Sequence, residues 1–172
     1  MRYRGDDDPA GEAFWRFSLA LYARPGVADA LIAIQDRAAR DVNLMLFGLW
    51  LGACRGRLLT AGELAGAEAA MSPIVGAAVA PLRRLRRQLK AAIDPDLAAL
   101  RRRITALEIA AEKRVQYRLA AHCSGMSGAL SECDRLAAAQ ANLALYLAGE
   151  TGSDEAGVLR QALASLIRRA EH

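Results

Sequence analysis

The chain has 172 residues, a length that fits one domain with a hydrophobic core of its own. Its composition is 53% hydrophobic and 24% charged, which excludes an intrinsically disordered chain. Aromatic residues make up only 5%, which argues against a β-sandwich or barrel, whereas 38 alanines and 25 leucines favour helices. We therefore predict an all-α fold.

The positive charge of the chain is concentrated in one segment. The net charge is +4, and residues 81–120 alone contain eleven basic and four acidic residues. The segments on either side are close to balanced. The basicity is therefore a local property that needs a local explanation.

Features that report on the cellular compartment are few. The three cysteines have irregular spacing and do not form a disulfide framework, and no apolar run follows the charged N-terminal residues. The longest strongly apolar stretch, residues 42–54, is shorter than the roughly 20 residues that a membrane span needs. We expect a cytoplasmic protein without a membrane span.

The first three predicted helices lie between residues 9 and 55. Asp8-Pro9 combines an N-cap residue with proline at the first helical position, and predicts a helix over about 9–23. A second helix is predicted over 27–38. Asp41 is placed to cap a third, over 42–55, which is apolar on every side and so belongs at the centre of the core. Glycines at four-residue spacing predict a groove along it for a neighbouring backbone: Gly48, Gly52 and Gly56.

The middle of the chain predicts two further helices. Thr60 and Glu63 have the spacing of a capping box, which opens the first of them. Ser72-Pro73 predicts the start of the next, which runs to about residue 93. Pro81 lies two turns inside that second helix and predicts a kink or a break.

The last part of the chain predicts a long helix and two shorter ones. Asp94-Pro95 opens the long helix, which runs to about residue 123, and the others cover about 129–148 and 153–170. Apolar residues alternate along the long helix at spacings of three and four, as in a coiled-coil seam: Leu97, Leu100, Ile104, Leu107 and Ala111.

Together these elements predict one domain over residues 1–172, a bundle of seven to eight helices. The aromatic residues concentrate in its first part, so we expect a compact core over 9–93. We expect a long helical hairpin and a last helix over 94–172.

A first candidate site combines polar residues at the corner between the second and third helices: Gln35, Asp36, Asp41 and Asn43. A pair of carboxylates in different environments can act as acid and base, or hold a cation. The same residues also fit ordinary roles at helix ends. A small-molecule site or an active site here is therefore one hypothesis.

A second candidate is a basic surface: Arg83, Arg84, Arg86, Arg87, Lys90, Arg101, Arg102 and Arg103. Basic amphipathic helices contact nucleic acid, acidic proteins or anionic membranes. No aromatic side chains alternate with these bases, which argues against stacking on nucleic-acid bases. The bases also fit the solvated face of a core helix.

The sequence predicts no metal site, no catalytic residues and no cofactor. His122 and Cys123 are adjacent, so on a helix they point about 100° apart and do not suit one zinc ion. A phosphate-binding P-loop motif is absent.

Several runs of the chain resemble an uncharacterised family of small proteobacterial proteins, described only as a domain of unknown function. The runs are Phe14-Trp15-x-Phe17, Leu21 to Val27, Gln35-Asp36-Arg37, Asp41-Val42-Asn43-Leu44, Leu49-Trp50-Leu51, Pro81-Leu82-Arg83 and Leu107-Glu108. The resemblance covers about residues 10–115. It implies a bacterial, cytosolic setting and brings no activity, cofactor or catalytic residue. The loop Ala38-Ala39-Arg40 departs from the glycine-containing turn expected in relatives.

Our leading hypothesis from the sequence is a non-enzymatic protein that binds another protein, for which an acidic partner would suit the basic segment. The helical seam and the alanine-rich last third lead us to expect a homodimer. The alternatives are a ligand-binding protein or enzyme that uses the polar corner, and a nucleic-acid-associated protein that uses Arg83 to Arg103.

Overall fold

The computed structural model describes residues 8–91, 93–124, 134–148 and 154–170, and these contain helices and no strand. The predicted all-α, multi-helix fold is confirmed. The parts predicted over 129–133 and at 153 lie outside the described residues. The helices are α1 (Pro9–Tyr22), α2 (Val27–Ala38), α3 (Val42–Arg55), α4 (Ala61–Ile74), α5 (Ala80–Gln88), α6 (Pro95–Ser124), α7 (Arg135–Leu147) and α8 (Asp154–Ala170).

Side chains cap the helices where the sequence predicts it. The Asp8 carboxylate accepts a hydrogen bond from the Ala10 N–H at 3.0 Å, and the Asp41 carboxylate accepts one from the Asn43 N–H at 2.7 Å. Thr60 and Glu63 form a reciprocal capping box at the start of α4. These caps satisfy backbone donors that the first turn of a helix leaves free.

Helix α3 lies at the centre of the body, and all its residues from Val42 to Ala53 are buried. Trp50 stacks on Phe14 with ring centroids 4.9 Å apart. On the other side, α7 lies in the glycine groove, since a Cβ at Gly52 would overlap the backbone of Ala139. The predicted close approach of a neighbouring helix is thus confirmed, and α7 is that helix.

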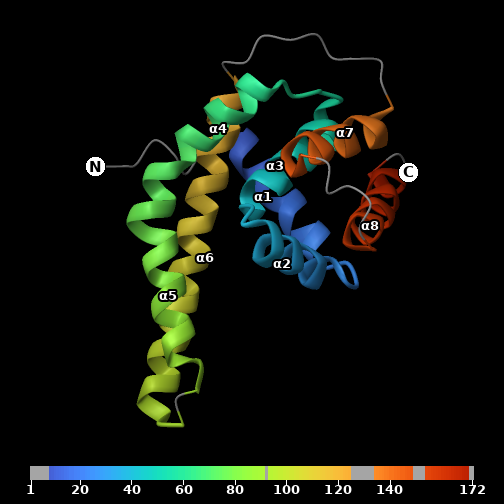
Figure 1. The fold of residues 1–172 in the computed structure, drawn as a ribbon. Coiled ribbons are helices and arrows are strands. Elements are labelled where there is room, and N and C mark those ends of the chain that lie inside the picture. Colours follow the sequence, from blue (N-terminus) through green and yellow to red (C-terminus); the bar gives the residue numbers. More distant parts are fainter. Residues whose placement is uncertain (1–7, 92, 125–133, 149–153, 171–172) are drawn as a thin grey trace.

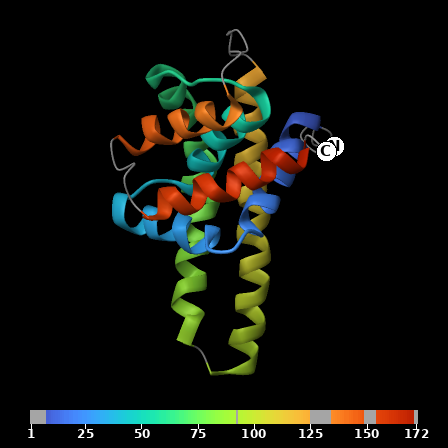
Figure 2. The ribbon, with the colours of Figure 1, turned by 90° about the vertical axis from the view of Figure 1, so that its right-hand side faces the viewer.

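A long helical hairpin projects from the body (Figure 1). Its first arm is one continuous helix, made of α4, a π-helical turn at Val75–Val79, α5 and a short 3₁₀ turn at Leu89–Ala91. Its second arm is α6, which packs along all these segments. Helices α1, α2, α3, α7 and α8 form the body on one side of the hairpin (Figure 2).

The arms of this hairpin differ from those that the sequence indicated. We expected α6 to pair with the C-terminal helices, but its partner is the preceding arm, and α7 and α8 pack on α3 and α2. The alanine-rich face of α7 fits the glycine groove of α3 more closely than it could fit the seam on α6. The C-terminal helices therefore complete the body, and the aromatic core extends beyond residue 93.

Two prolines in the first arm also act differently from the prediction. Pro73 does not open a new helix, because the buried face of the arm, with Ala67, Met71 and Val79, keeps its contact with α6 across it. Pro73 itself is exposed, so its ring and missing N–H affect only the solvent side. Before Pro81 the helix widens into the π turn, where the Ala80 N–H donates to the Val75 carbonyl.

This first arm, Ala61–Ala91, has the length and apolar composition of a helix that could cross a membrane. Helices α1 and α2, which are bent relative to each other, also meet this test if the pair is counted as one span. The sequence prediction took residues 42–54 as the longest strongly apolar stretch and did not consider this arm. Length and apolar composition alone do not identify a membrane span, because the buried core helix of a protein can have both.

Candidate functional site

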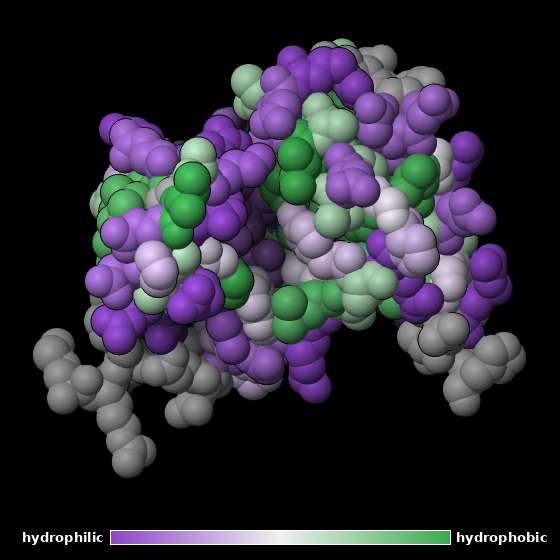
Figure 3. Space-filling view, turned by 90° about the horizontal axis from the view of Figure 1, so that it is seen from below, coloured by the Kyte–Doolittle hydropathy of each residue, from purple (hydrophilic) through white to green (hydrophobic). Residues whose placement is uncertain are grey.

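A hollow lies between the hairpin and the body, at the corner where α2 meets α3. Its volume is about 280 Å³, and its lining is Gln35, Asp36, Ala39, Arg40, Asp41, Arg83 and Arg87. Seen from the end of the hairpin, the surface is hollowed between the two parts of the molecule, and hydrophilic side chains surround the hollow (Figure 3). Ala39 has a positive φ of 51°, the left-handed conformation for which a glycine-containing turn would be suited.

Three of the four residues predicted at this corner line the hollow, and the fourth does not. Gln35, Asp36 and Asp41 lie at its surface. Asn43 is only 4% exposed, and its Oδ1 accepts a hydrogen bond from Gln116 at 3.2 Å. Because Asn43 lies two residues after Asp41, it is rotated by about 200° around the helix and points into the core.

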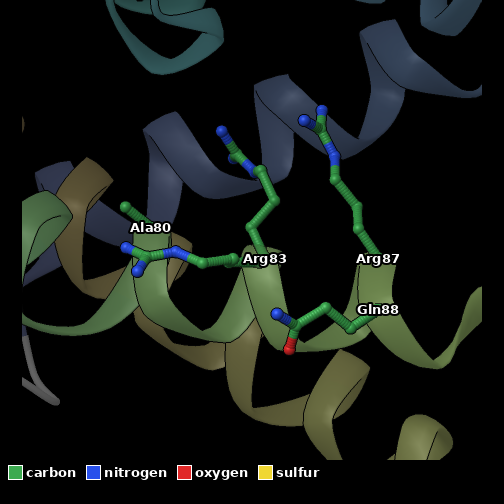
Figure 4. A pocket seen from close by; sticks show the side chains of 5 residues that line it. Ala80, Arg83, Arg87 and Gln88 are labelled. Atoms are coloured by element: carbon green, nitrogen blue, oxygen red, sulfur yellow. The ribbon is translucent and has the colours of Figure 1, made fainter.

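Arginines of α5 form the opposite wall. Arg83 Nε donates to Glu108 Oε1 at 3.1 Å, and Arg83 Nη2 donates to Glu112 Oε1 at 2.7 Å. Arg87 reaches from α5 toward the neighbouring helix (Figure 4), and its Nη2 lies 3.9 Å from Asp36 Oδ1. The hollow is thus bounded by side chains of opposite charge from α2, the α2–α3 loop and α5.

The structure does not gather the eight predicted bases on one face. Arg83 and Arg86 both bind the nearly buried carboxylate of Glu108, between the two arms of the hairpin. Arg84, Arg87, Lys90, Arg102 and Arg103 are exposed, but the adjacent Arg102 and Arg103 point about 100° apart. Two of the eight predicted bases thus form ion pairs within the hairpin, and five of them are exposed.

Two weakly acidic groups flank the hollow. Loss of solvent, with the negative charges of Glu112 and Asp41, raises the pKa of Tyr22 to about 12, against the opposing charge of Arg83. Loss of solvent also raises the pKa of Glu112, although the hydrogen bond from Arg83 acts in the other direction. Tyr22, Asp41, Arg83 and Glu112 therefore lie within electrostatic range of one another, although they come from four different helices.

The pKa of Glu108 is shifted in the opposite direction, downward. Burial opposes its ionisation, but hydrogen bonds from Arg86 and Arg83 outweigh burial and lower its pKa below 4.5. A carboxyl whose pKa is lower in the folded state contributes stability above its unfolded pKa. That contribution is lost as the pH falls through its folded pKa.

Glu108→Gln should reduce the free energy of unfolding by about 2 kcal/mol at neutral pH, because two guanidinium groups lose a charged acceptor. Urea denaturation at pH 7 and pH 3 measures the effect. The difference from the unmodified protein should shrink at pH 3, because the stabilisation by ionised Glu108 decreases as the pH falls below its unfolded-state pKa toward its lowered folded-state pKa. Glu68→Gln, on the exposed side of α4, serves as the control. An equal difference at both pH values would contradict the assignment.

Beneath the hollow lies a buried polar layer within the bundle. Ser18 donates to Gln116 Oε1 at 2.9 Å and to the Phe14 carbonyl at 3.0 Å, and Gln116 donates to Asn43. Each of the three is less than 5% exposed. Each is close in sequence to a residue of the hollow or its flank. Ser18 lies about one helical turn before Tyr22, and Gln116 lies about one turn after Glu112. Asn43 lies two residues after Asp41.

Sequence reasoning missed Tyr22, Glu112, Ser18 and Gln116. A signal for two of them was present, because Glu108, Glu112 and Gln116 recur every four residues along the long helix and so share one face. The sequence prediction drew no inference from that face. For Ser18 and Tyr22 the surrounding aromatic residues gave no indication of a polar role.

The arrangement can bind a polar molecule through charge and hydrogen bonds. Arg87 and Arg40 offer guanidinium donors, and Asp36 and Asp41 offer carboxylate acceptors. Within the described part of the chain, histidine, cysteine and acidic residues do not form a group of three that could hold a metal ion. Binding here would depend on the organic side chains.

A family model described as a protein of unknown function (DUF2390) matches residues 13–119. No curated protein and no solved structure matches the chain. The matched segment contains every residue of the hollow, of its flank and of the polar layer beneath it. Helices α7 and α8 lie outside the matched segment.

Proposed function

Because this chain belongs to the DUF2390 family, for which no function is described, we propose its function from the site itself: the protein binds a small polar molecule in the hollow between α5 and the α2–α3 corner. The observation that carries this proposal is the convergence of Tyr22, Asp41, Arg83 and Glu112 above a buried polar layer.

The free-energy cost of burying these polar side chains supports the proposal. Burying polar groups in a helical bundle is unfavourable unless each finds a partner, and apolar residues would fill the same space without that requirement. The described part of the chain has five buried polar residues. Glu108 binds Arg83 of the lining, and hydrogen bonds join Ser18, Gln116 and Asn43, which is two residues from Asp41 of the lining. Polar groups concentrated around a concave surface are typical of binding sites.

A ligand screen with a blocked variant tests the proposal. Gln35→Trp places a large ring in a hollow of about 280 Å³, whereas Ile32→Trp adds the same ring to an exposed position of α2 outside the lining. A ligand at a hundredfold excess over its Kd stabilises a protein by about 2.7 kcal/mol, or roughly 5 °C or more in Tm at this size. We expect metabolites that raise the Tm of the unmodified protein and of Ile32→Trp, but not of Gln35→Trp. A screen without such a compound, or equal shifts in both variants, would reject the function.

The exposed leucines of the hairpin favour self-association as a second function. Leu85, Leu100 and Leu107 are 42%, 46% and 58% exposed. Leu85 lies two residues from Arg83 and from Arg87, about 200° around the helix, so it is on the side of α5 opposite to the hollow. Leu107 lies nine residues from the inward-facing Gln116, or about 180° around α6. Apolar residues also gather on the edge of the hairpin that points away from the body (Figure 3).

A second copy of the chain would cover this outer face by pairing hairpin with hairpin, as in a four-helix bundle. Sedimentation equilibrium should then give twice the monomer mass of 18.4 kDa at micromolar concentration. The double variant Leu100→Glu with Leu107→Glu should return the mass to that of the monomer, whereas Ile32→Glu on α2 should not. A mass of one chain for the unmodified protein at every concentration would reject the dimer.

A further inference from the structure

The chemistry of the ligand follows from how charge is divided along the cleft, an inference that rests on the proposed function. A second and larger hollow, of about 580 Å³, adjoins the first along α5 and shares Arg83 and Arg87 with it. Its described lining is Ala80, Arg83, Arg84, Arg87 and Gln88, and contains no carboxylate. The cleft therefore has a basic end along α5 and a mixed end at the α2–α3 corner.

At the basic end, two of the three arginines are available to an anion. Arg83 is held by Glu108 and Glu112. The closest recorded carboxylate oxygen to Arg87 is 3.9 Å away, which is longer than a hydrogen bond. Arg84 and Arg87 are three residues apart and lie side by side on the helix. Guanidinium groups from one hollow suit a phosphate or a carboxylate, which accepts paired hydrogen bonds from them.

At the mixed end, the body contributes the carboxylates of Asp36 and Asp41 beside the guanidinium of Arg40. One oxygen of Asp41 accepts the N-cap hydrogen bond from Asn43. A carboxylate has a second oxygen, and the Asp36 carboxylate is largely exposed. A ligand group that donates hydrogen bonds, or carries positive charge, suits this end.

We propose that the cleft takes a compact molecule with two unlike ends. Its anionic group, a phosphate or a carboxylate, lies beside Arg84 and Arg87. Its donating group, an ammonium or a hydroxyl, lies beside Asp36 and Asp41. Such a molecule could be a free metabolite or the headgroup of a lipid, since both present the same chemistry.

Isothermal titration with three probes separates the two ends. O-phosphoethanolamine carries both groups, inorganic phosphate carries only the anion, and ethanolamine carries only the cation. We expect O-phosphoethanolamine to bind about tenfold more tightly than phosphate at equal ionic strength, the effect of one additional charge-assisted contact. Ethanolamine alone should bind most weakly. Equal affinity for phosphate and O-phosphoethanolamine would overturn the proposal, as would no binding of either.

Matched variants locate the two ends. Arg87→Gln should weaken the binding of phosphate and of O-phosphoethanolamine by about tenfold. Asp36→Asn should weaken only the binding of O-phosphoethanolamine, so that its affinity equals that of phosphate. Arg102→Gln on α6 and Asp29→Asn in the first turn of α2 change the same charges outside the lining and should have no effect. Circular dichroism confirms that each variant folds. An equal loss in Arg102→Gln would show diffuse attraction and overturn the site.

Vesicles distinguish the two sources of the ligand. Cosedimentation with phosphatidylethanolamine vesicles, absent for phosphatidylcholine vesicles and lost in Asp36→Asn, would support a lipid headgroup. Binding of the free compound alone would support a metabolite. If none of these probes binds while the screen above yields a ligand excluded by Gln35→Trp, the ligand class is wrong and the binding function stands. If neither experiment yields a ligand, the proposed ligand class and the proposed binding function are both wrong.

Discussion

Replacing Gly52 with alanine should destabilise the protein by about 3 kcal/mol, because the new methyl group has no space to enter. A Cβ at this position would overlap the backbone of Ala139 and lie 2.6 Å from the carbonyl carbon of Ala138. Backbone atoms in a helix cannot move aside as the end of a flexible side chain can. α7 must therefore separate from α3 along its whole length.

Urea denaturation measures this loss. Gly157→Ala, in the interior of α8, is the matched control, because nothing lies within 4 Å of its added methyl group. Alanine in an open helical position stabilises a helix by about 0.5–1 kcal/mol relative to glycine. The two identical substitutions should thus change stability in opposite directions. A Gly52→Ala variant as stable as the unmodified protein would show that α7 does not pack in this groove.

Replacing Trp50 with alanine should cost about 3–5 kcal/mol, because it removes the largest side chain of the core and leaves a cavity. Trp50 is 2% exposed, and it packs on Phe14 and Phe47 with centroid distances of 4.9 and 6.3 Å. Chemical denaturation gives the energy. Fluorescence in a Trp15→Phe background tests the burial directly, and an emission maximum typical of an exposed indole would contradict it.

The position of Trp50 could be predicted from the sequence because it depends on one helix alone. A helix without a polar side has to be surrounded, so residues 42–55 were assigned to the centre before any neighbour was known. The caps at Asp8, Asp41 and Thr60 are local in the same sense, and the structure confirms them. The family resemblance, placed at about residues 10–115, agrees with the matched segment 13–119.

Features that depend on which helices meet were harder to predict. The seam on α6 does not itself specify its partner, and several alanine-rich helices could have covered it. The ion pairs of Arg83 and Arg86 with Glu108 identify the true partner, but their separation of more than twenty residues gave no signal without the fold. Asn43 was grouped with Asp41 because they are close in sequence, although helical geometry points them in different directions.

The π turn in the first arm determines which side of the helix carries Arg83. On a regular α-helix, Arg83 would lie about 120° around the axis from Met71, twelve residues earlier. The π turn accommodates one additional residue between them, which reduces this angle to about 20° and brings Arg83 to the side of the helix that faces Glu108 and Glu112.

The π turn is thus geometrically equivalent to a one-residue insertion in a straight α-helix that keeps the residues after it on the same face. A chain shortened by one residue within Val75–Val79 would close the π turn into a regular α-helix, and Arg83 would stay about 20° from Met71, on the side that faces Glu108 and Glu112. Loss of a single residue within this turn would therefore leave both the helical scaffold and the basic wall of the cleft in place.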